Sequence, residues 1–442
     1  MALRSPWRSG GRPLTLSSIT RAVLVLILIA TFVAAAPLFA QDGATTPNFF
    51  IEKIEVREAR RVSPDVVVAE SRLREGEEYS EAELRDASAR LMRLPFLLSA
   101  EFSLEKGSER GRYVLVVTIN ETKPFFYALD LRPIFTTDHR VEPDYSDRIG
   151  VADSAATLGM RWFVGRRGAL HVALISSDYG GDFARDYAAV AVGYTQYDLF
   201  GTRAFATLNL KRVITESDST VSPQLVVGVP LSGNQTLTLE LDETRIGDNV
   251  EQFGDQTFDT NSAQRIVGVT WSYNTTNKPF LPTRGTLLTV RPRFSWSDAA
   301  TYRFIVLNPG QFPPNYVVQG DTVHREAREV TVKAVRYFEL DERNSVSAGI
   351  EAGFTHFSAE SAVIGQTGDH VTRGTIVGGY SYSLWDASRT RNGDSRLELN
   401  ALIGTRDIHY GDFYRAEQQQ LTASWVRRSS WGVLRLGVGY AW

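Results

Sequence analysis

Short stretches of this chain place apolar residues at every second position, with polar or charged residues between them. Such stretches lie at 207–211, 236–242 and 397–403. In the second, for instance, Leu239 stands between Thr238 and Glu240. Successive side chains of a β-strand point to opposite faces of a sheet, so each stretch predicts a strand with one apolar and one polar face.

A closed β-barrel is the architecture that such strands favour. Beyond residue 40 there is no apolar run long enough for a membrane-spanning helix, which needs about 20 residues. A barrel needs no such run, because its backbone hydrogen bonds form between neighbouring strands and leave no open edge. We therefore predict a mostly β protein in which residues 125–442 form a transmembrane antiparallel β-barrel with an apolar outside and a wet inside.

The number of strands follows from the expected connections. Short turns at 200–202 and 231–234 contrast with long connections at 136–154, 245–262 and 298–325, an alternation typical of outer-membrane barrels. The segments between them give about 14 strands, or about 16 if 304–319 or 373–384 holds a further hairpin. We expect an even number, because the last strand should end on the side of the membrane from which the chain enters.

The C-terminal stretch 435–442 predicts the last membrane strand. It alternates large apolar residues with small or polar ones and ends on an indole, and tryptophan and tyrosine favour the membrane–water interface. The stretch resembles the C-terminal targeting signal of bacterial outer-membrane proteins. The residues that carry this resemblance are Arg435, Gly437, Tyr440 and Trp442.

Residues 1–40 have the composition of a secretory signal peptide. Basic residues, Arg21 the last of them, precede an apolar run over 22–36, and Ala40 suits cleavage. The run is shorter than a membrane-spanning helix requires. We expect a mature chain that begins near Gln41 and is exported to the bacterial outer membrane.

Residues 48–124 predict a small α+β module. Ser63 followed by Pro64 marks a helix start, and Ser80 with Glu83 forms a capping box for a second helix that must end before Pro95. The alternating stretch 50–56 predicts a strand, and the stretches 99–104 and 113–120 predict two more on either side of a turn at 107–111. The expected order is strand, helix, helix, strand, strand.

This module resembles a polypeptide-transport-associated (POTRA) domain. The resemblance is carried by 54–56, 76–80, Phe96, Phe102 and 117–124. Domains of that family bind extended chains by adding a strand to an exposed sheet edge, which uses backbone hydrogen bonds and tolerates many sequences. The resemblance implies a periplasmic N-terminal domain that handles polypeptides, with a passive spacer as the alternative.

The barrel resembles the BamA and TamA type of outer-membrane assembly barrel, the bacterial surface antigen family. The stretch 271–274, followed by Pro-Thr-Arg-Gly at 282–285, is similar to a turn of that family. In barrels of that family, the sixth external loop folds into the lumen, and an arginine of an Arg-Gly motif in this loop pairs with acidic groups of the barrel wall. Here Trp385 and Asp386 replace that pair, and Arg373-Gly374 upstream is an alternative placement. The expected lumen-loop residues are Arg373, Gly374, Gly378, Gly379, Leu384, Trp385 and Asp386.

Insertion of a client polypeptide would require a weak seam between the first and last barrel strands. Proline cannot donate to a ladder and glycine weakens a strand, and Pro133 and Gly437 lie in these two strands. An opened seam could then pair with a client's edge. The expected seam residues are Tyr127, Leu129, Leu131, Pro133, Leu436, Val438, Tyr440 and Trp442.

The resemblance implies a non-enzymatic protein that assists insertion or translocation of polypeptides at the outer membrane. Its partners would be unfolded or nascent outer-membrane polypeptides, the lipid bilayer, and periplasmic chaperones or lipoproteins. A passive or substrate-selective pore is one alternative, because inward charges would line an aqueous path equally well. A two-partner-type secretion transporter is another.

Other function classes find little support in the sequence. The net charge of -3 does not favour nucleic acid, and the chain has no cysteine. Six histidines occur without a nucleophile elbow or a metal-ligand cluster, so we expect no catalytic residues, no metal and no cofactor. Asp407 and His409, which share one strand face, are the close acid/base pair that we would test, and a solvated pair is its ordinary explanation.

Overall fold

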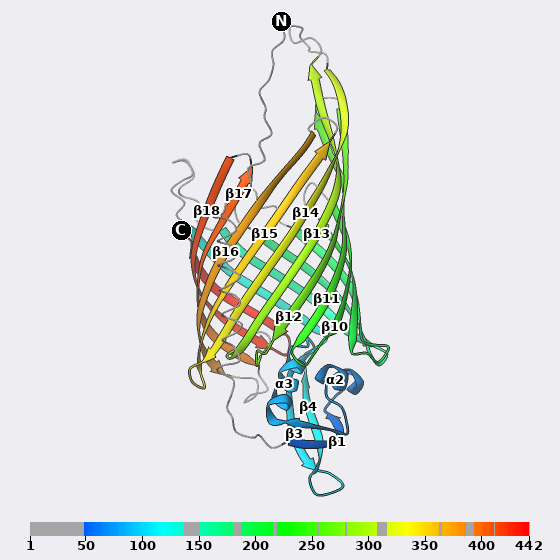
Figure 1. The fold of residues 1–442 in the computed structure, drawn as a ribbon, viewed down its shortest axis with the longest axis vertical. Helices are drawn as coiled ribbons and strands as arrows, with labels where there is room; N and C mark the ends of the chain where they lie inside the picture. Colours follow the sequence, from blue (N-terminus) through cyan, green and yellow to red (C-terminus); the bar gives the residue numbers. More distant parts are fainter. Residues whose placement is uncertain are drawn as a thin grey trace. The chain divides into compact units, whose positions relative to one another are not determined.

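The computed structural model describes residues 48–136, 151–179, 187–214, 219–253, 256–278, 281–306, 316–361, 365–385, 393–410 and 412–441. Residues 48–442 make one compact unit, which contains an N-terminal module over 48–124 and a closed β-barrel (Figure 1). The expected signal peptide at 1–40 lies outside the described residues. Neither described helix is long and apolar enough to cross a membrane.

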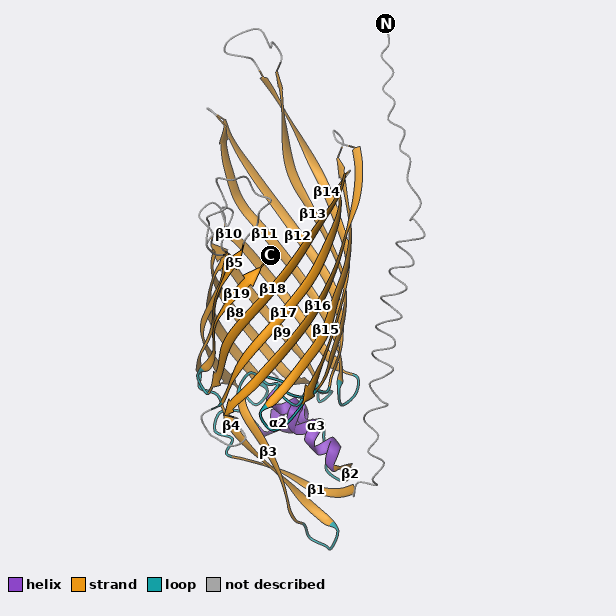
Figure 2. Ribbon diagram, turned by 90° about the vertical axis from the view of Figure 1, so that its left-hand side faces the viewer, coloured by secondary structure: helices purple, strands orange, loops and turns teal. Residues whose placement is uncertain are grey.

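The N-terminal module is a four-stranded sheet with two helices (Figure 2). The strand order is β2-β1-β4-β3, and β1 lies parallel to β4. The elements are β1 (Asn48–Arg57), α2 (Pro64–Ser71), β2 (Glu77–Ser80), α3 (Glu81–Met92), β3 (Leu97–Lys106) and β4 (Arg112–Glu121). The sequence pattern missed β2, because four residues before a helix are too few to show alternation.

Both helices begin where the caps predict. The Ser63 side chain accepts from the Asp65 N–H, and Pro64 occupies the first helical position. In α3 the Ser80 side chain accepts from the Glu83 N–H while Glu83 accepts from the Ser80 N–H, which completes the capping box. Each helix start is therefore fixed locally by the sequence.

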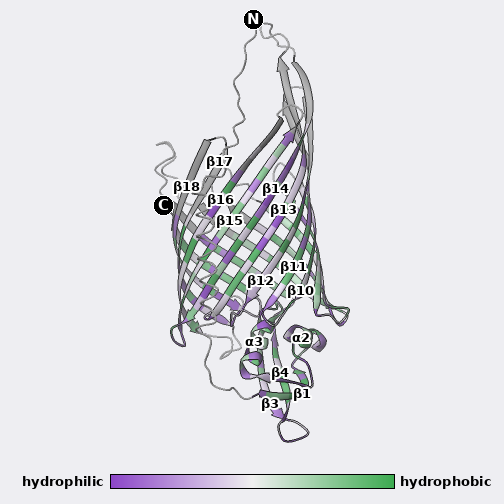
Figure 3. Cartoon of the chain, viewed as in Figure 1, coloured by the Kyte–Doolittle hydropathy of each residue, from purple (hydrophilic) through white to green (hydrophobic). Residues whose placement is uncertain are grey.

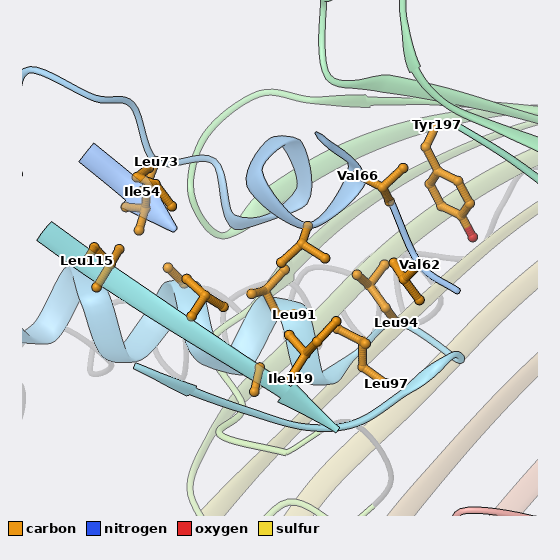
Figure 4. Close-up of a cluster of buried hydrophobic side chains, with 14 of the residues drawn as sticks. Ile54, Val62, Val66, Leu73, Leu91, Leu94, Leu97, Leu115, Ile119 and Tyr197 are labelled. Atoms are coloured by element: carbon orange, nitrogen blue, oxygen red, sulfur yellow. The ribbon is translucent and has the colours of Figure 1, made fainter. Parts of the chain in front are cut away.

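The module core is continuous with the base of the barrel. Leu91 and Ile119 are fully buried within the module, and Ala169 and Tyr197 of two barrel strands belong to the same apolar cluster (Figure 4). The Phe96 ring packs edge-on against Phe163 at 5.0 Å and against Tyr197 at 5.6 Å between ring centroids. This packing joins α3 and β3 to the strands that follow the module.

Fifteen strands close the barrel, each paired with its neighbours in chain order. They are β5 (Phe125–Thr136), β6 (Val151–Val164), β7 (Gly168–Tyr179), β8 (Tyr187–Leu199), β9 (Ala204–Ile214), β10 (Ser219–Pro230), β11 (Gln235–Phe253), β12 (Gln256–Asn274), β13 (Gly285–Val306), β14 (Tyr316–Glu339), β15 (Asn344–Ser361), β16 (Gly365–Trp385), β17 (Asp394–Tyr410), β18 (Asp412–Ser429) and β19 (Gly432–Ala441). The fold class is the expected one, a β-barrel preceded by a small α+β module.

The expectation of an even strand number is wrong. The stretch 373–384 is not part of a loop but most of β16, and this strand raises the expected 14 to 15. With an odd number, β19 runs parallel to β5, and every other pair in the barrel is antiparallel. The last strand therefore ends at the end of the barrel away from the module, not at the end from which the chain enters.

Two of the expected long connections are largely strand. Pairing between β11 and β12 continues to Phe253↔Gln256, and that between β13 and β14 to Val306↔Tyr316. The sequence pattern ended these strands near 245 and 297, where the simple alternation of leucine with polar residues stops. The two hairpins extend the barrel wall well past that point (Figure 1).

Candidate functional site

The outer face of the barrel carries the apolar half of each alternating strand. Leu239 of β11 and Leu208 of β9 are among many large apolar side chains that are exposed there, and hydrophobic segments alternate with polar ones along the strands (Figure 3). Glu240, next to Leu239, lies on the opposite face and is only 13% exposed. The predicted sorting of side chains between two faces is confirmed for 207–211, 236–242 and 397–403.

The inner face carries a network of polar side chains. Asn209 Nδ2 donates to Gln224 Oε1 at 3.1 Å, and Gln224 Nε2 donates to Glu240 Oε1 at 2.9 Å. Arg291 Nη2 reaches the other Glu240 oxygen at 2.5 Å. Arg291 belongs to β13 and Glu240 to β11, and Gly268 of the intervening β12 lies opposite Glu240, where it has no side chain to intervene.

Arg373 belongs to the same inner face, in a different role from the one expected. Its Nη2 donates to Glu329 Oε1 of β14 at 2.9 Å. The Arg373 side chain crosses the intervening strand β15 at Gly353, where a Cβ would collide with it. The predicted pairing of an arginine with an acidic wall group is present. The arginine, however, comes from a wall strand and not from a loop folded into the lumen.

The remaining expected lumen-loop residues also lie in the barrel wall. Gly374 pairs with Ala352, Gly378 with Ala348 and Gly379 with Ser347, all in the continuous β15–β16 ladder. Leu384 and Trp385 are exposed at the end of β16, and the Arg427 guanidinium lies 5.8 Å from the Trp385 ring centroid. Asp386 lies outside the described residues. The glycines were mistaken for loop residues because they interrupt the apolar alternation of a strand.

The first and last barrel strands form the predicted seam, with a parallel ladder. The pairs run from Gly432↔Tyr127 through Leu434↔Leu129 to Leu436↔Leu131, and resume at Gly439↔Ile134. The gap in this ladder faces Pro133, which has no N–H to donate. Pro133 itself is paired on its other side with Ala152 of β6. Tyr440 pairs with Phe135, whereas Trp442 lies outside the described residues.

An ionic bridge crosses this seam on its inner side. Arg435 of β19 lies opposite Asp130 of β5, with an Nη1–Oδ2 distance of 3.6 Å. Its Nη2 lies 3.4 Å from Glu398 Oε2 of β17, and Asp130 also binds Arg132. Leu436, Val438 and Tyr440 are exposed on the outer side. The expected alternation of this last strand is confirmed over its described residues.

The turn between β12 and β13, expected from the Pro-Thr-Arg-Gly segment, is held by two arginines. Arg396 of β17 donates from Nη1 to the Pro282 carbonyl at 3.1 Å and from Nη2 to the Leu281 carbonyl, and it is only 4% exposed. Arg93, at the end of α3, donates to the carbonyls of Asn274 and Thr276, each at 2.9 Å. Gly285 closes the turn with a φ of 105°, a value that favours glycine.

This turn also contacts the inner face near the seam. A cavity of 210 Å³ is lined by Pro282 together with Arg396, Glu398 and Arg435. The sequence pattern does not mark Arg396 as a functional residue. A buried arginine in a strand flanked by serine gives no signal of its own, because its acceptors lie more than a hundred positions away in the chain.

Glu70 of α2 is partly buried where the module meets β8, with one carboxylate oxygen fully buried. Burial raises its pKa to about 7, against the opposing effect of Arg72 and with a smaller contribution from Asp198 of β8. One of its carboxylate oxygens has no hydrogen-bond partner among the described residues. On the other side of the module, Arg428 of β18 donates to the Leu97 carbonyl at 2.6 Å.

No group of three or more potential metal ligands occurs among the described residues. Asp407 and His409 lie in β17, but their side chains fall outside what the structure describes. The expectation that the chain has no catalytic residues therefore stays a prediction.

Comparisons with known proteins give no family. No family model matches the sequence, and no curated protein does. Among solved structures, the chain is similar to BamA from Haemophilus ducreyi lacking POTRA domains 1–3, at 11% identity over 89% of this chain and 85% of that one, with a TM-score of 0.40. It is also similar to the open form of the ferric-catecholate import receptor Fiu from E. coli K12, at 9% identity over 73% of this chain and 65% of that one, with a TM-score of 0.34. A third similar structure is OmpT, an outer membrane protein of Vibrio cholerae, at 11% identity over 72% of this chain and 98% of that one, with a TM-score of 0.31. Likenesses at this level carry no argument about activity or partners.

Proposed function

We propose that this protein is an outer-membrane β-barrel that assists the insertion or translocation of polypeptides, with its N-terminal module in the periplasm. Exposed leucines on every second residue of the barrel strands support the membrane location, because a closed barrel is the β architecture that lipid tolerates. The module, which resembles a POTRA domain, would receive the polypeptide at the free edge of β3, which pairs with β4 alone.

The observation that carries this proposal is the interrupted ladder between β19 and β5. Parallel pairing is slightly less stable per residue than antiparallel pairing, and this ladder lacks hydrogen bonds opposite Pro133. It is the one parallel junction of the described wall, and it would be the place where a strand of another polypeptide could pair. The Arg435–Asp130 bridge would break and reform as the seam opens.

A disulfide across the seam tests the proposal. Leu129 and Leu434 are register partners, and the chain contains no native cysteine to compete. In vesicles, the oxidised Leu129→Cys/Leu434→Cys protein should lose its acceleration of insertion of an unfolded eight-stranded outer-membrane barrel, and reduction should restore it. The matched control is Leu225→Cys/Leu241→Cys, register partners of β10 and β11. Equal activity of the oxidised seam and control proteins would reject the gate.

A pore is the second candidate function, and the charged inner face favours it. Arg291–Glu240 and Arg373–Glu329 line the inside of the wall, as side chains of an aqueous channel do. The expected lumen loop at 373–385 belongs to the wall and does not fill the interior. Large, steady currents in a planar bilayer, unaffected by the seam disulfide, would favour the pore over the insertion factor.

A further inference from the structure

A cavity of 640 Å³ lies between the N-terminal module and two barrel turns. The module contributes the segment 72–74 after α2 and residues of β2 and α3, and the barrel contributes the segments 201–203 and 230–234 and Tyr273 of β12. This volume is in the range of ligand sites, about 300–1,000 Å³. Its charged lining consists of Arg72, Arg74, Arg90, Arg203, Glu83 and Asp86.

The arginines of this cavity are short of acidic partners. Among the described residues, no carboxylate lies within ion-pair distance of Arg72, Arg90 or Arg203, and Arg74 is paired with Glu77. Glu83 is engaged in the capping box of α3, and Asp86 accepts from Asn234 at 3.1 Å. The cavity therefore has a surplus of positive charge in a half-enclosed place.

The positive charges of neighbouring guanidinium groups repel one another in this cavity. Burial, and to a smaller extent the charge of Arg72, lower the pKa of Arg90 to about 10. Burial likewise lowers the pKa of Arg72, which Glu70 partly offsets. An anion in the cavity would relieve this repulsion and would be held by charge-assisted hydrogen bonds.

Donors for such an anion remain available. Arg90 uses Nε and Nη2 on the Ser71 carbonyl, and its Nη1 has no acceptor among the described residues. Arg203 gives only Nη1, at 3.4 Å, to the Arg72 carbonyl. Arg72, in contrast, is committed to the turn, where it donates to the carbonyls of Ser232 and Gly233.

On the barrel side the apolar side chain of Leu231 lines the cavity, and Phe200 directly precedes the lining segment 201–203. Phe200 is 96% exposed and Leu231 is 54% exposed, at the two turns that form the cavity wall. Both turns directly follow strands of the apolar outer face. An aromatic and an aliphatic side chain in these positions suit the interface between lipid headgroups and acyl chains.

We propose that this cavity binds the phosphodiester headgroup of an anionic phospholipid. The phosphate would accept from Arg90 Nη1 and Arg203, and the acyl chains would leave over Phe200 and Leu231 toward the outer face of the barrel. The identification of the ligand as a membrane lipid rests on the proposed membrane location. The binding of a phosphodiester group by the arginines does not depend on that location. One lipid would thereby fix the module against the barrel turns.

Binding of a soluble lipid by the full chain in detergent tests the proposal. Dihexanoyl phosphatidylglycerol should bind, dihexanoyl phosphatidylcholine and inorganic phosphate should bind at least tenfold more weakly, and titration calorimetry measures each. Arg90→Gln/Arg203→Gln should weaken phosphatidylglycerol binding at least tenfold. The matched control, Arg85→Gln on the exposed side of α3, should leave it unchanged.

A second variant keeps all the arginines in place. A Cβ at Gly233 would lie 3.3 Å from Arg90 Nη1, so Gly233→Asp brings a carboxylate into the anion position. It should abolish binding even if the double variant fails to fold. Undiminished binding by Gly233→Asp would overturn the site. Inorganic phosphate bound as tightly as the lipid, with no loss in Phe200→Ser, would overturn the lipid as its ligand. These readouts do not involve the seam, so they stand apart from the disulfide test.

Discussion

The barrel has a short wall and a tall wall, and they differ in more than length. Strands β19 and β5 to β10, the short wall, are between 10 and 14 residues long. Strands β11 to β18, the tall wall, are between 17 and 24 residues long. A strand crosses a bilayer with about 9–11 residues. The short wall is therefore little longer than a membrane crossing, whereas the tall wall must continue beyond it.

The outer face of the tall wall changes character along its strands. On β11 the leucines end at Leu241, and the next outward residue, Glu243, pairs with Arg245 at 2.5 Å and lies 3.7 Å from Arg265 of β12. On β14, Arg328 lies 3.7 Å from Glu326 in the same way. Membrane thickness thus accounts for the apolar part of each strand, and water for the rest.

The strongest test of this comparison places one charge on each part of the outer face. Leu239→Arg lies in the apolar part and should lower the free energy of unfolding by about 2–4 kcal/mol in a bilayer, because a charge there faces lipid. Ser358→Arg lies on β15 opposite Glu326, in the charged part, and should change it little. Urea unfolding in vesicles measures both. Equal losses would show that the apolar part is not in lipid.

The second test concerns how the module meets the short wall, where Glu70 is partly buried beside β8. Its pKa is about 7 in the folded chain and lies near its ordinary value of 4.5 in the unfolded chain. Between these values the folded chain holds a proton that the unfolded chain releases, so stability should fall as pH rises from about 4.5 to about 7, by at most about 3 kcal/mol.

Glu70→Gln should remove this pH dependence, because an amide does not titrate. Thermal unfolding of the full chain at pH 5 and pH 8 gives the measurement, and Glu78→Gln on β2, whose side chain is exposed, is the matched control. A pH dependence that survives in Glu70→Gln would assign it to other groups.

The two walls also differ in how much of them the sequence predicts. Strands such as β9 and the lower part of β11 follow from strict alternation, because lipid on one side and water on the other impose it. The stretches 299–306 of β13 and 316–321 of β14 show no strict alternation of apolar and polar residues in the sequence, so the pattern does not mark them as strand. In β16 the glycines at 374, 378 and 379 hide the strand. The even strand number and the direction of β19 were wrong for another reason, because they rested on the assumption that the last strand ends on the side from which the chain enters.

For the candidate site, the sequence allows predictions about where proline and glycine weaken strand pairing. It does not allow predictions about contacts between residues that are distant in the chain. The proline of β5 and the glycines of β19 predict a weak seam, which stays a prediction: the ladder is interrupted beside Pro133, as are two other ladders beside Pro223 and Pro292. Arg396 and Arg93 hold one turn from two distant elements, and only the folded chain brings their acceptors together.

The third test removes the hydrogen bonds by which Arg396 of the tall wall holds the turn between β12 and β13. Arg396→Gln leaves the carbonyls of Leu281 and Pro282 without their donors, which should cost about 1–3 kcal/mol because both lie in a buried place. A released turn should also raise single-channel conductance in planar bilayers. Arg343→Gln, in the exposed turn between β14 and β15, is the control and should alter neither. Unchanged stability and conductance in Arg396→Gln would show that the turn is held by other contacts.

The smallest effect separates the seam from the tall wall. Arg435→Gln removes the ionic bridges from β19 to Asp130 and Glu398, and Arg373→Gln removes the ion pair with Glu329 inside the tall wall. Each should lower stability by about 0.2–1 kcal/mol, because partly solvated ion pairs contribute little.

Their consequences for local opening should nevertheless differ. At the seam the ladder is already interrupted, so Arg435→Gln should speed amide hydrogen exchange at Leu434 and Leu436, while the continuous ladders around Arg373 keep exchange slow. Equal exchange in the two variants would mean that the junction of β19 with β5 is as firm as the rest of the wall. A firm junction would leave the pore as the function that the inner charges favour.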